Sequence, residues 1–183
     1  MLPIRLPALV CAFVLVLVGA PALAAQAPTV VRLRVQLPAY RSPVIMDTLV
    51  MPVEHEVPYA AAWAAAERVF NDLKIPRDKR DSAQGILAAT RYTKSSSMAG
   101  QPMSRFMNCG FGMTGPNADH YRINMAVAAL LTPVSATRTR IGVGLAASGM
   151  NMQGASTDPV MCGSSGRFES DFLARLAKAL ATP

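Results

Sequence analysis

Two runs of sequence decide the fold: Tyr121-Arg-Ile-Asn-Met-Ala-Val-Ala-Ala-Leu-Leu131 and Ile141-Gly-Val-Gly-Leu-Ala-Ala147. Apolar side chains alternate with polar or small ones along both runs, which is the side-chain period of a half-buried strand. Only the connection Thr132 to Arg138 separates them. The two runs therefore predict a long antiparallel hairpin with one face packed against the rest of the protein.

Two helical patterns accompany this hairpin. From Tyr59 to Lys74, apolar residues recur at spacings of three and four, and Pro76 ends the pattern. Gly166 to Leu180 has a similar apolar stripe. Further strands are predicted at residues 31–37, 49–57, 85–93 and 104–109, with Pro52 disturbing the second, and loops at 94–102 and 149–163. This order predicts an α+β fold, an antiparallel sheet with two helices packed on one face as a two-layer sandwich.

The first 24 residues have the composition of a secretory signal peptide. Arg5 gives a positive start, Ala8 to Gly19 is apolar, and Ala22-Leu23-Ala24 is a small-residue cleavage site. The apolar run is too short to cross a bilayer, so no transmembrane anchor is predicted. We expect residues 1–24 to be removed, residues 25–29 to form a disordered leader, and residues 30–183 to form one domain. The mature protein is then exported, to the periplasm or the medium.

The charge of the chain is positive. Removing Arg5 from the 18 basic residues leaves 17 against 11 acidic ones, which gives about +6. An exported protein meets little nucleic acid, so we expect no nucleic-acid partner. The charge is typical of a soluble protein, and weak attraction to anionic lipid or polysaccharide is the alternative.

Two cysteines, Cys109 and Cys162, remain after cleavage. An even number in an oxidising compartment predicts one disulfide. The bond closes a loop of 53 residues (162 − 109), which corresponds to about 4 kcal/mol of stabilisation in the chain-entropy treatment.

Two resemblances can be stated from these residues. The motif Ser104-Arg-Phe-Met-Asn-Cys-Gly110, followed by Thr114-Gly-Pro-Asn-Ala-Asp119 and Tyr121-Arg122, resembles one shared by small exported bacterial proteins of unknown function. A helix with Tyr59 and Trp63, followed by Leu73-x-Ile75, a sheet and a closing helix, is similar, more distantly, to the domains of the BamC outer-membrane assembly lipoprotein. That second resemblance implies an accessory, non-enzymatic binding module and assigns no functional residue.

Several chemistries fit the sequence poorly. Gly110-x-Gly112-x-x-Gly115 has the spacing of a dinucleotide-binding loop, but a Pro-Asn turn and a strand follow where a helix is required. We interpret it as a flexible turn beside the disulfide. His55 and His120 could form a zinc site with the two cysteines, but the short spacings of such sites are missing. We therefore expect no metal and no cofactor, with His55 a partly buried strand residue.

Catalysis has little support either. The chain has no Gly-x-Ser-x-Gly elbow and no clear acid–base pair, so we expect no enzyme, an unrecognised hydrolase being the exception. Methionine is abundant, and Met150-x-Met152 resembles a compact soft-ligand pair for Cu(I). Filling of an irregular core is the simpler interpretation of these methionines.

The hairpin face opposite the helices is the predicted docking surface. Its side chains are unusually small, and glycine in a strand often marks close approach by another backbone or a ligand. The alternative is that the chain's own N-terminal segment covers it. The residues of this small-residue face are Arg122, Asn124, Ala126, Ala128, Arg140, Gly142, Gly144, Ala146 and Ser148.

These patterns predict an exported, non-enzymatic interaction module of the bacterial cell envelope, whose partner is another envelope protein. The alternative is a periplasmic carrier that holds a small apolar ligand or a soft metal ion, Cu(I), between sheet and helices.

Overall fold

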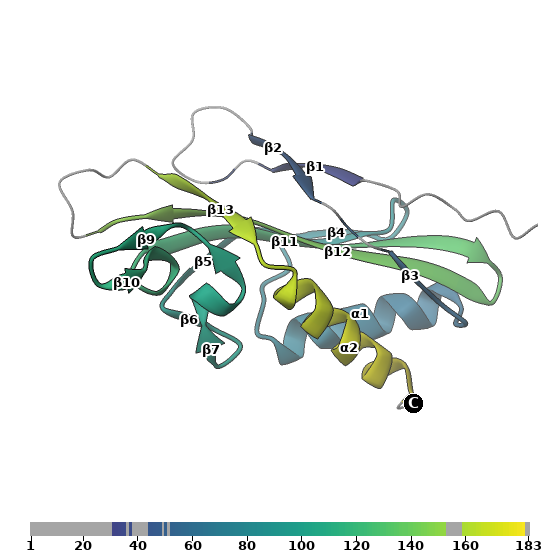
Figure 1. The fold of residues 1–183 in the computed structure, drawn as a ribbon. Coiled ribbons are helices and arrows are strands. Elements are labelled where there is room, and N and C mark those ends of the chain that lie inside the picture. Colours follow the sequence, from purple (N-terminus) through teal and green to yellow (C-terminus); the bar gives the residue numbers. More distant parts are fainter. Residues whose placement is uncertain are drawn as a thin grey trace, which may run out of the picture.

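The computed structural model describes residues 31–35, 37, 44–48, 50, 52–152 and 159–181. The predicted signal peptide and leader lie outside these residues. A seven-stranded antiparallel sheet forms the centre (Figure 1). Its strands run in the order β4 (Lys79–Asp81), β5 (Ile86–Ser95), β11 (Arg122–Ser135), β12 (Arg138–Met150), β13 (Val160–Ser164) and β8 (Met107–Asn108), and β3 (Val53–His55) pairs with β12.

The predicted hairpin is the pair β11 and β12, joined in register from Arg122 opposite Met150 to Ser135 opposite Arg138. It is longer than expected, because residues 132–135 extend β11 instead of forming a connection. Strand β12 has a different neighbour at each end. Its first residues pair with β3 and its last with β13.

Two helices cover one face of this sheet, α1 (Tyr59–Asp72) and α2 (Arg167–Ala181), as Figure 1 shows. Aromatic rings fill the space between the layers: Phe70 meets Phe172 edge to face at 5.4 Å, and Phe106 meets Phe168 at 6.3 Å. The alternating residues of β11 and β12 complete the core from the sheet side, namely Ile123, Met125, Val127, Ala129, Leu131, Ile141, Val143, Leu145 and Ala147. The α+β prediction is confirmed.

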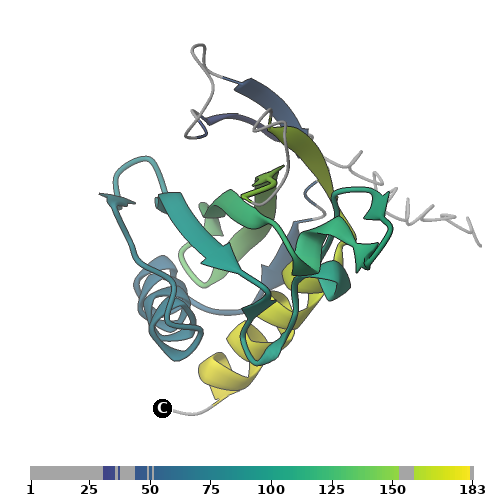
Figure 2. The same cartoon turned by 90° about the vertical axis from the view of Figure 1, so that its left-hand side faces the viewer.

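A separate two-stranded ribbon lies over the opposite face of the sheet. Strands β1 (Val31–Val35) and β2 (Val44–Thr48) pair with each other and not with the central sheet. Figures 1 and 2 place this ribbon on the side away from α1 and α2. The chain thus adds a third layer to the predicted sandwich.

Helix α1 ends in a left-handed residue. Lys74 has φ +54°, its N–H donates to the Asn71 carbonyl at 2.9 Å, and the Ile75 N–H donates to the Phe70 carbonyl at 2.9 Å. This is the Schellman arrangement, in which glycine usually takes the left-handed position. Ile75 is buried against the core. Lys74 therefore adopts an unfavourable backbone conformation at the end of α1.

Short elements fill regions predicted to be loops. Strands β6 (Ser97–Met98) and β7 (Gln101–Pro102) form a hairpin, and β9 (Phe111–Gly112) and β10 (Gly115–Pro116) form another. The strand expected at 104–109 is wrong in part, because η1 (Met103–Arg105) is a 3₁₀ turn and only β8 is extended. A second 3₁₀ turn, η2 (Asn117–Asp119), precedes β11. Strands of two residues show no periodicity in sequence.

Candidate functional site

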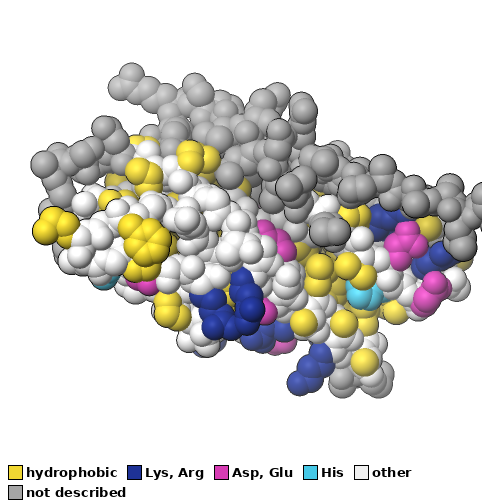
Figure 3. All heavy atoms as spheres, in the orientation of Figure 1, with side chains coloured by type: hydrophobic (Ala, Val, Ile, Leu, Met, Phe, Trp, Pro, Cys, Tyr) yellow, Lys and Arg dark blue, Asp and Glu magenta, His cyan; other side chains and the backbone are white. Residues whose placement is uncertain are grey.

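The β9–β10 hairpin carries apolar side chains in solvent. Phe111 is 75% exposed, and Met113 at the tip is fully exposed. Large apolar residues of a folded protein are usually covered at least in part. Hydrophobic side chains gather over this end of the molecule (Figure 3). Contiguous exposed apolar surface often marks a site of interaction, so we take Phe111 and Met113 as the candidate site.

A disulfide holds the base of the hairpin. Cys109 and Cys162 are bonded, with an S–S distance of 2.02 Å, as the cysteine count predicts. Cys162 belongs to β13 and lies opposite Ala147 of β12. The hairpin is thus tied through one covalent bond to the central sheet.

Hydrogen bonds brace the same segment. The Asn117 backbone N–H donates to the Gly110 carbonyl at 3.0 Å, and the Asn117 side-chain amide donates to the Cys109 carbonyl at 3.3 Å. A His120 ring nitrogen, Nε2, lies 3.2 Å from the Thr114 carbonyl oxygen. Gly110 adopts φ +83°, a conformation that glycine takes at little cost. The flexible turn predicted here is therefore a braced hairpin.

The sequence contains a signal for this site. The glycine spacing from Gly110 to Gly115 indicates a turn but does not by itself indicate exposed side chains. The intervening residues, Phe111 and Met113, are both apolar in a stretch too short to bury them. An aromatic residue between two glycines, next to a cysteine, is the feature of the sequence that indicates an exposed apolar site here.

The predicted small-residue face is buried. Arg122 is exposed and Arg140 half-buried, while the remaining seven residues are covered: Asn124, Ala126, Ala128, Gly142, Gly144, Ala146 and Ser148. A Cβ atom added to Gly142 would collide with Cγ1 of Val50, which precedes β3 and is itself 3% exposed. The prediction of an open surface is corrected: part of the chain's own N-terminal segment packs there, the alternative stated above. Docking of a partner at these residues would require that segment to move.

Two buried polar groups lie on this covered face. Asn124 and Ser148 are directly opposite each other on β11 and β12. The Thr93 hydroxyl donates to Asn124 Oδ1 at 3.0 Å. Within the described residues, Asn124 Nδ2 and Ser148 Oγ have no hydrogen-bond partner. The covered face therefore holds two buried polar groups that no described residue satisfies.

The candidate metal ligands do not come together. Cys109 and Cys162 are consumed by the disulfide. No three His, Cys, Asp or Glu side chains gather into a possible metal site in the part of the chain that is described. Met152 is exposed, and the Sδ atom of Met150 accepts a hydrogen bond from Arg122 at 3.6 Å, so a cation already stands beside that thioether. Such a neighbour opposes Cu(I) binding.

His55 is partly buried in β3, as predicted. Burial lowers the pKa of its imidazole below the ordinary value. Its Nε2 atom is buried and has no hydrogen-bond partner among the described residues.

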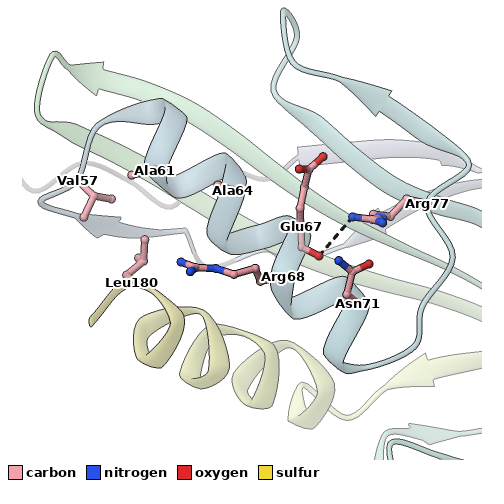
Figure 4. A pocket seen from close by; sticks show the side chains of 8 residues that line it. All are labelled: Val57, Ala61, Ala64, Glu67, Arg68, Asn71, Arg77 and Leu180. Carbon is pink, nitrogen blue, oxygen red and sulfur yellow. Dashed lines mark hydrogen bonds between the residues drawn. The ribbon is translucent and has the colours of Figure 1, made fainter. Parts of the chain in front are cut away.

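A hollow of about 380 Å³ lies along α1, between that helix and Leu180 of α2 (Figure 4). Its charged groups are already engaged. Arg68 donates to the Ala179 carbonyl at 2.7 Å, Arg77 donates to the Glu67 carbonyl at 3.4 Å, and the Glu67 carboxylate pairs with Arg80. We interpret this hollow as a helix-packing junction.

No helix in the described ranges is both long and apolar enough to cross a bilayer. Compared with known proteins, the chain matches no family model and no curated sequence. The resemblances to small exported proteins and to BamC-like domains remain predictions.

Proposed function

We propose that the protein is an exported, non-enzymatic interaction module of the bacterial cell envelope, which docks on another envelope protein through its β9–β10 hairpin. One observation carries the proposal: a disulfide and several hydrogen bonds hold Phe111 and Met113 in solvent. The backbone that carries these side chains is already ordered, so binding costs little backbone conformational entropy.

The residue types suit this role. Aromatic anchors that enter a partner's pocket supply much of the energy of small interfaces. Methionine is flexible and polarisable, and it adapts to irregular surfaces. Full burial of each side chain contributes about 1.5–3 kcal/mol. Phe111 and Met113 together therefore supply a few kcal/mol, which suits a module that binds reversibly.

Export is supported by the disulfide and by the signal-peptide pattern of residues 1–24. Disulfides persist in the periplasm and outside the cell, and they are rare in a reducing cytosol. We place the mature protein in one of those compartments.

The carrier alternative has less support. The layer between sheet and helices, where a ligand was expected, is occupied by Phe70, Phe172 and Phe168, which contact one another at ring-centroid distances of 5.4 and 6.1 Å. An apolar ligand there would have to displace these rings. The interaction module requires no such rearrangement.

The test compares hairpin variants in crosslinking to intact envelopes. Phe111→Ser and Met113→Ser should each reduce crosslinked product several-fold without changing the melting temperature, because both side chains are already in water. Val134→Ser, which removes an apolar side chain that is 41% exposed at the far end of β11, is the matched control and should retain full crosslinking. Equal loss in all three variants, or loss in none, would refute the proposal.

A further inference from the structure

Two adjoining hollows form a groove between the end of α1, the β6–β7 hairpin and α2. The larger, of about 340 Å³, is lined by Lys74, Lys94 and Arg175, and the smaller, of about 160 Å³, by Arg105 and Arg175. Leu73, Ala99 and Arg175 belong to both. We call these two hollows the basic groove. Dark-blue side chains gather over this region, below β9–β10 in the view of Figure 3.

The four cations of the groove are not neutralised. The ion pairs formed between described residues are Arg80–Glu67, Arg138 with Glu54 and Glu56, Arg140–Glu54 and Arg167–Asp171, and none includes a groove cation. Two carboxylates also line the groove. Asp171 is engaged with Arg167 at 3.9 Å, and Asp72 is the one acidic residue in the larger hollow. The larger hollow therefore holds three cations and one carboxylate.

Backbone strain is concentrated at the same place. Lys74, Ser96 and Ala99 are the described residues other than glycine with positive φ, at +54°, +64° and +50°. Lys74 and Ala99 line the groove, and Ser96 directly precedes its lining residue Ser97. Left-handed backbone is unfavourable for a residue with a side chain, and such residues cluster at functional sites. Glycine at position 74 would avoid this cost but would remove one of the cations.

The hydroxyl of a largely buried tyrosine completes the set. Tyr92 is 6% exposed and lines the larger hollow, and the Lys94 ammonium lies 5.7 Å from the centre of its ring. Burial raises the pKa of the Tyr92 phenol, so the group stays protonated and able to donate. Its hydroxyl takes part in none of the hydrogen bonds found between the described residues.

We propose that the basic groove binds a phosphate group, with Lys74, Lys94 and Arg175 supplying the positive charge and the Tyr92 hydroxyl donating a hydrogen bond. Phosphate has the multiple charge and the several acceptor oxygens that an arginine fork and point-charge lysines recognise. The larger hollow has about ten times the volume of one water molecule, roughly 30 Å³. It therefore accommodates a phosphate ester as well as the free ion. This site is separate from the hairpin and does not depend on the proposed function.

The experiment titrates the protein with inorganic phosphate and pyrophosphate at constant ionic strength, followed by amide chemical shifts. We expect saturable shifts at residues of the groove. Arg175→Gln and Lys94→Gln should each weaken binding about tenfold. Lys79→Gln removes the same charge from exposed β4, outside the groove, and should bind as the wild type does.

The variant Lys74→Gly distinguishes an effect on phosphate binding from an effect on the stability of the fold. Glycine relieves the left-handed strain, so this variant should melt at a higher temperature and yet bind phosphate more weakly. A variant that gains stability and loses affinity cannot be explained by damage to the fold.

Vesicles distinguish the source of the phosphate. Binding to phosphatidylglycerol vesicles that is absent with phosphatidylcholine vesicles and lost in Arg175→Gln identifies a lipid headgroup. Binding of inorganic phosphate without binding of vesicles identifies a free phosphate or a small phosphate ester. The proposal is overturned if no titration saturates, or if Lys79→Gln weakens binding as much as Arg175→Gln, which would indicate net charge alone.

Discussion

The Asp119 carboxylate accepts two hydrogen bonds from Ser104, one from the backbone N–H at 2.8 Å and one from the side-chain hydroxyl at 2.7 Å. These bonds join η1 to η2, the two turns that flank the β9–β10 hairpin. Both residues belong to the motif of residues 104–122, for which a likeness to small exported proteins is predicted. A structural role for that motif follows, because its polar residues brace the hairpin that Phe111 occupies.

Asp119→Ala removes both bonds and leaves the Ser104 donors to water. Bonds to a charged acceptor contribute about 1.5–3 kcal/mol each before relaxation, so we expect a total loss of about 2–4 kcal/mol. Chemical denaturation measures this loss. Asp119→Asn keeps one acceptor oxygen and should be destabilised less than Asp119→Ala. Equal stability of wild type and Asp119→Ala would show that the brace contributes nothing.

Removal of the disulfide should lower the free energy of unfolding. The double variant Cys109→Ser/Cys162→Ser frees a loop of 53 residues, and the expected loss of unfolding free energy is about 4 kcal/mol. Urea unfolding of this variant and of the wild type, with and without reductant, provides the comparison. Reductant should destabilise the wild type alone. Two reactive thiols in the unfolded, unreduced wild type would contradict the bond.

Gly142→Ala should destabilise the protein by about 1–3 kcal/mol, the range for overpacking. The added methyl group meets Val50 directly, whereas a Cβ at Gly163 has nothing within 4 Å, so Gly163→Ala is the control. Combining Gly142→Ala with Val50→Ala should cost less than the sum of the two single changes, since the truncation removes the clash. Strict additivity would mean that Val50 does not cover the sheet.

His55 should make stability depend on pH. Because burial lowers its pKa below the ordinary value of 6.5, the unfolded chain binds more protons than the folded one just below pH 6.5. Stability is therefore complete above pH 6.5 and falls as the pH decreases from 6.5 toward the folded-state pKa. His55→Gln should flatten this slope, as measured by unfolding free energies between pH 5 and 8. An unchanged slope would assign the dependence to other groups.

The sequence predicted the parts of the fold that depend on long periodic patterns. Residues 121–131 and 141–147 repeat with a period of two, and both helices repeat their apolar residues at spacings of three and four, so their faces could be assigned correctly. The pairing of Cys109 with Cys162 followed from the expected export, which leaves these two cysteines in an oxidising compartment.

The candidate site could not be predicted in the same way. Phe111 is exposed because a hairpin of two-residue strands has no second layer to cover it. A strand of two residues is too short for the alternation of apolar and polar residues to indicate which side chains are exposed. The covering of Gly142 by Val50 depends on contact between residues 92 positions apart (142 − 50). Lys74, Lys94 and Arg175 come from three separate elements, and only the tertiary fold brings them to one groove.

The bond between Cys109 and Cys162 closes a covalent ring that contains β9, β10, β11 and β12 complete. A protease that cuts once inside this ring, for example at the exposed turn of Ala136 and Thr137 between β11 and β12, opens the ring without releasing a fragment. The nicked chain would migrate as one band on a non-reducing gel and as two bands after reduction. The disulfide would thus keep both parts of the sheet together after a single cut in the backbone.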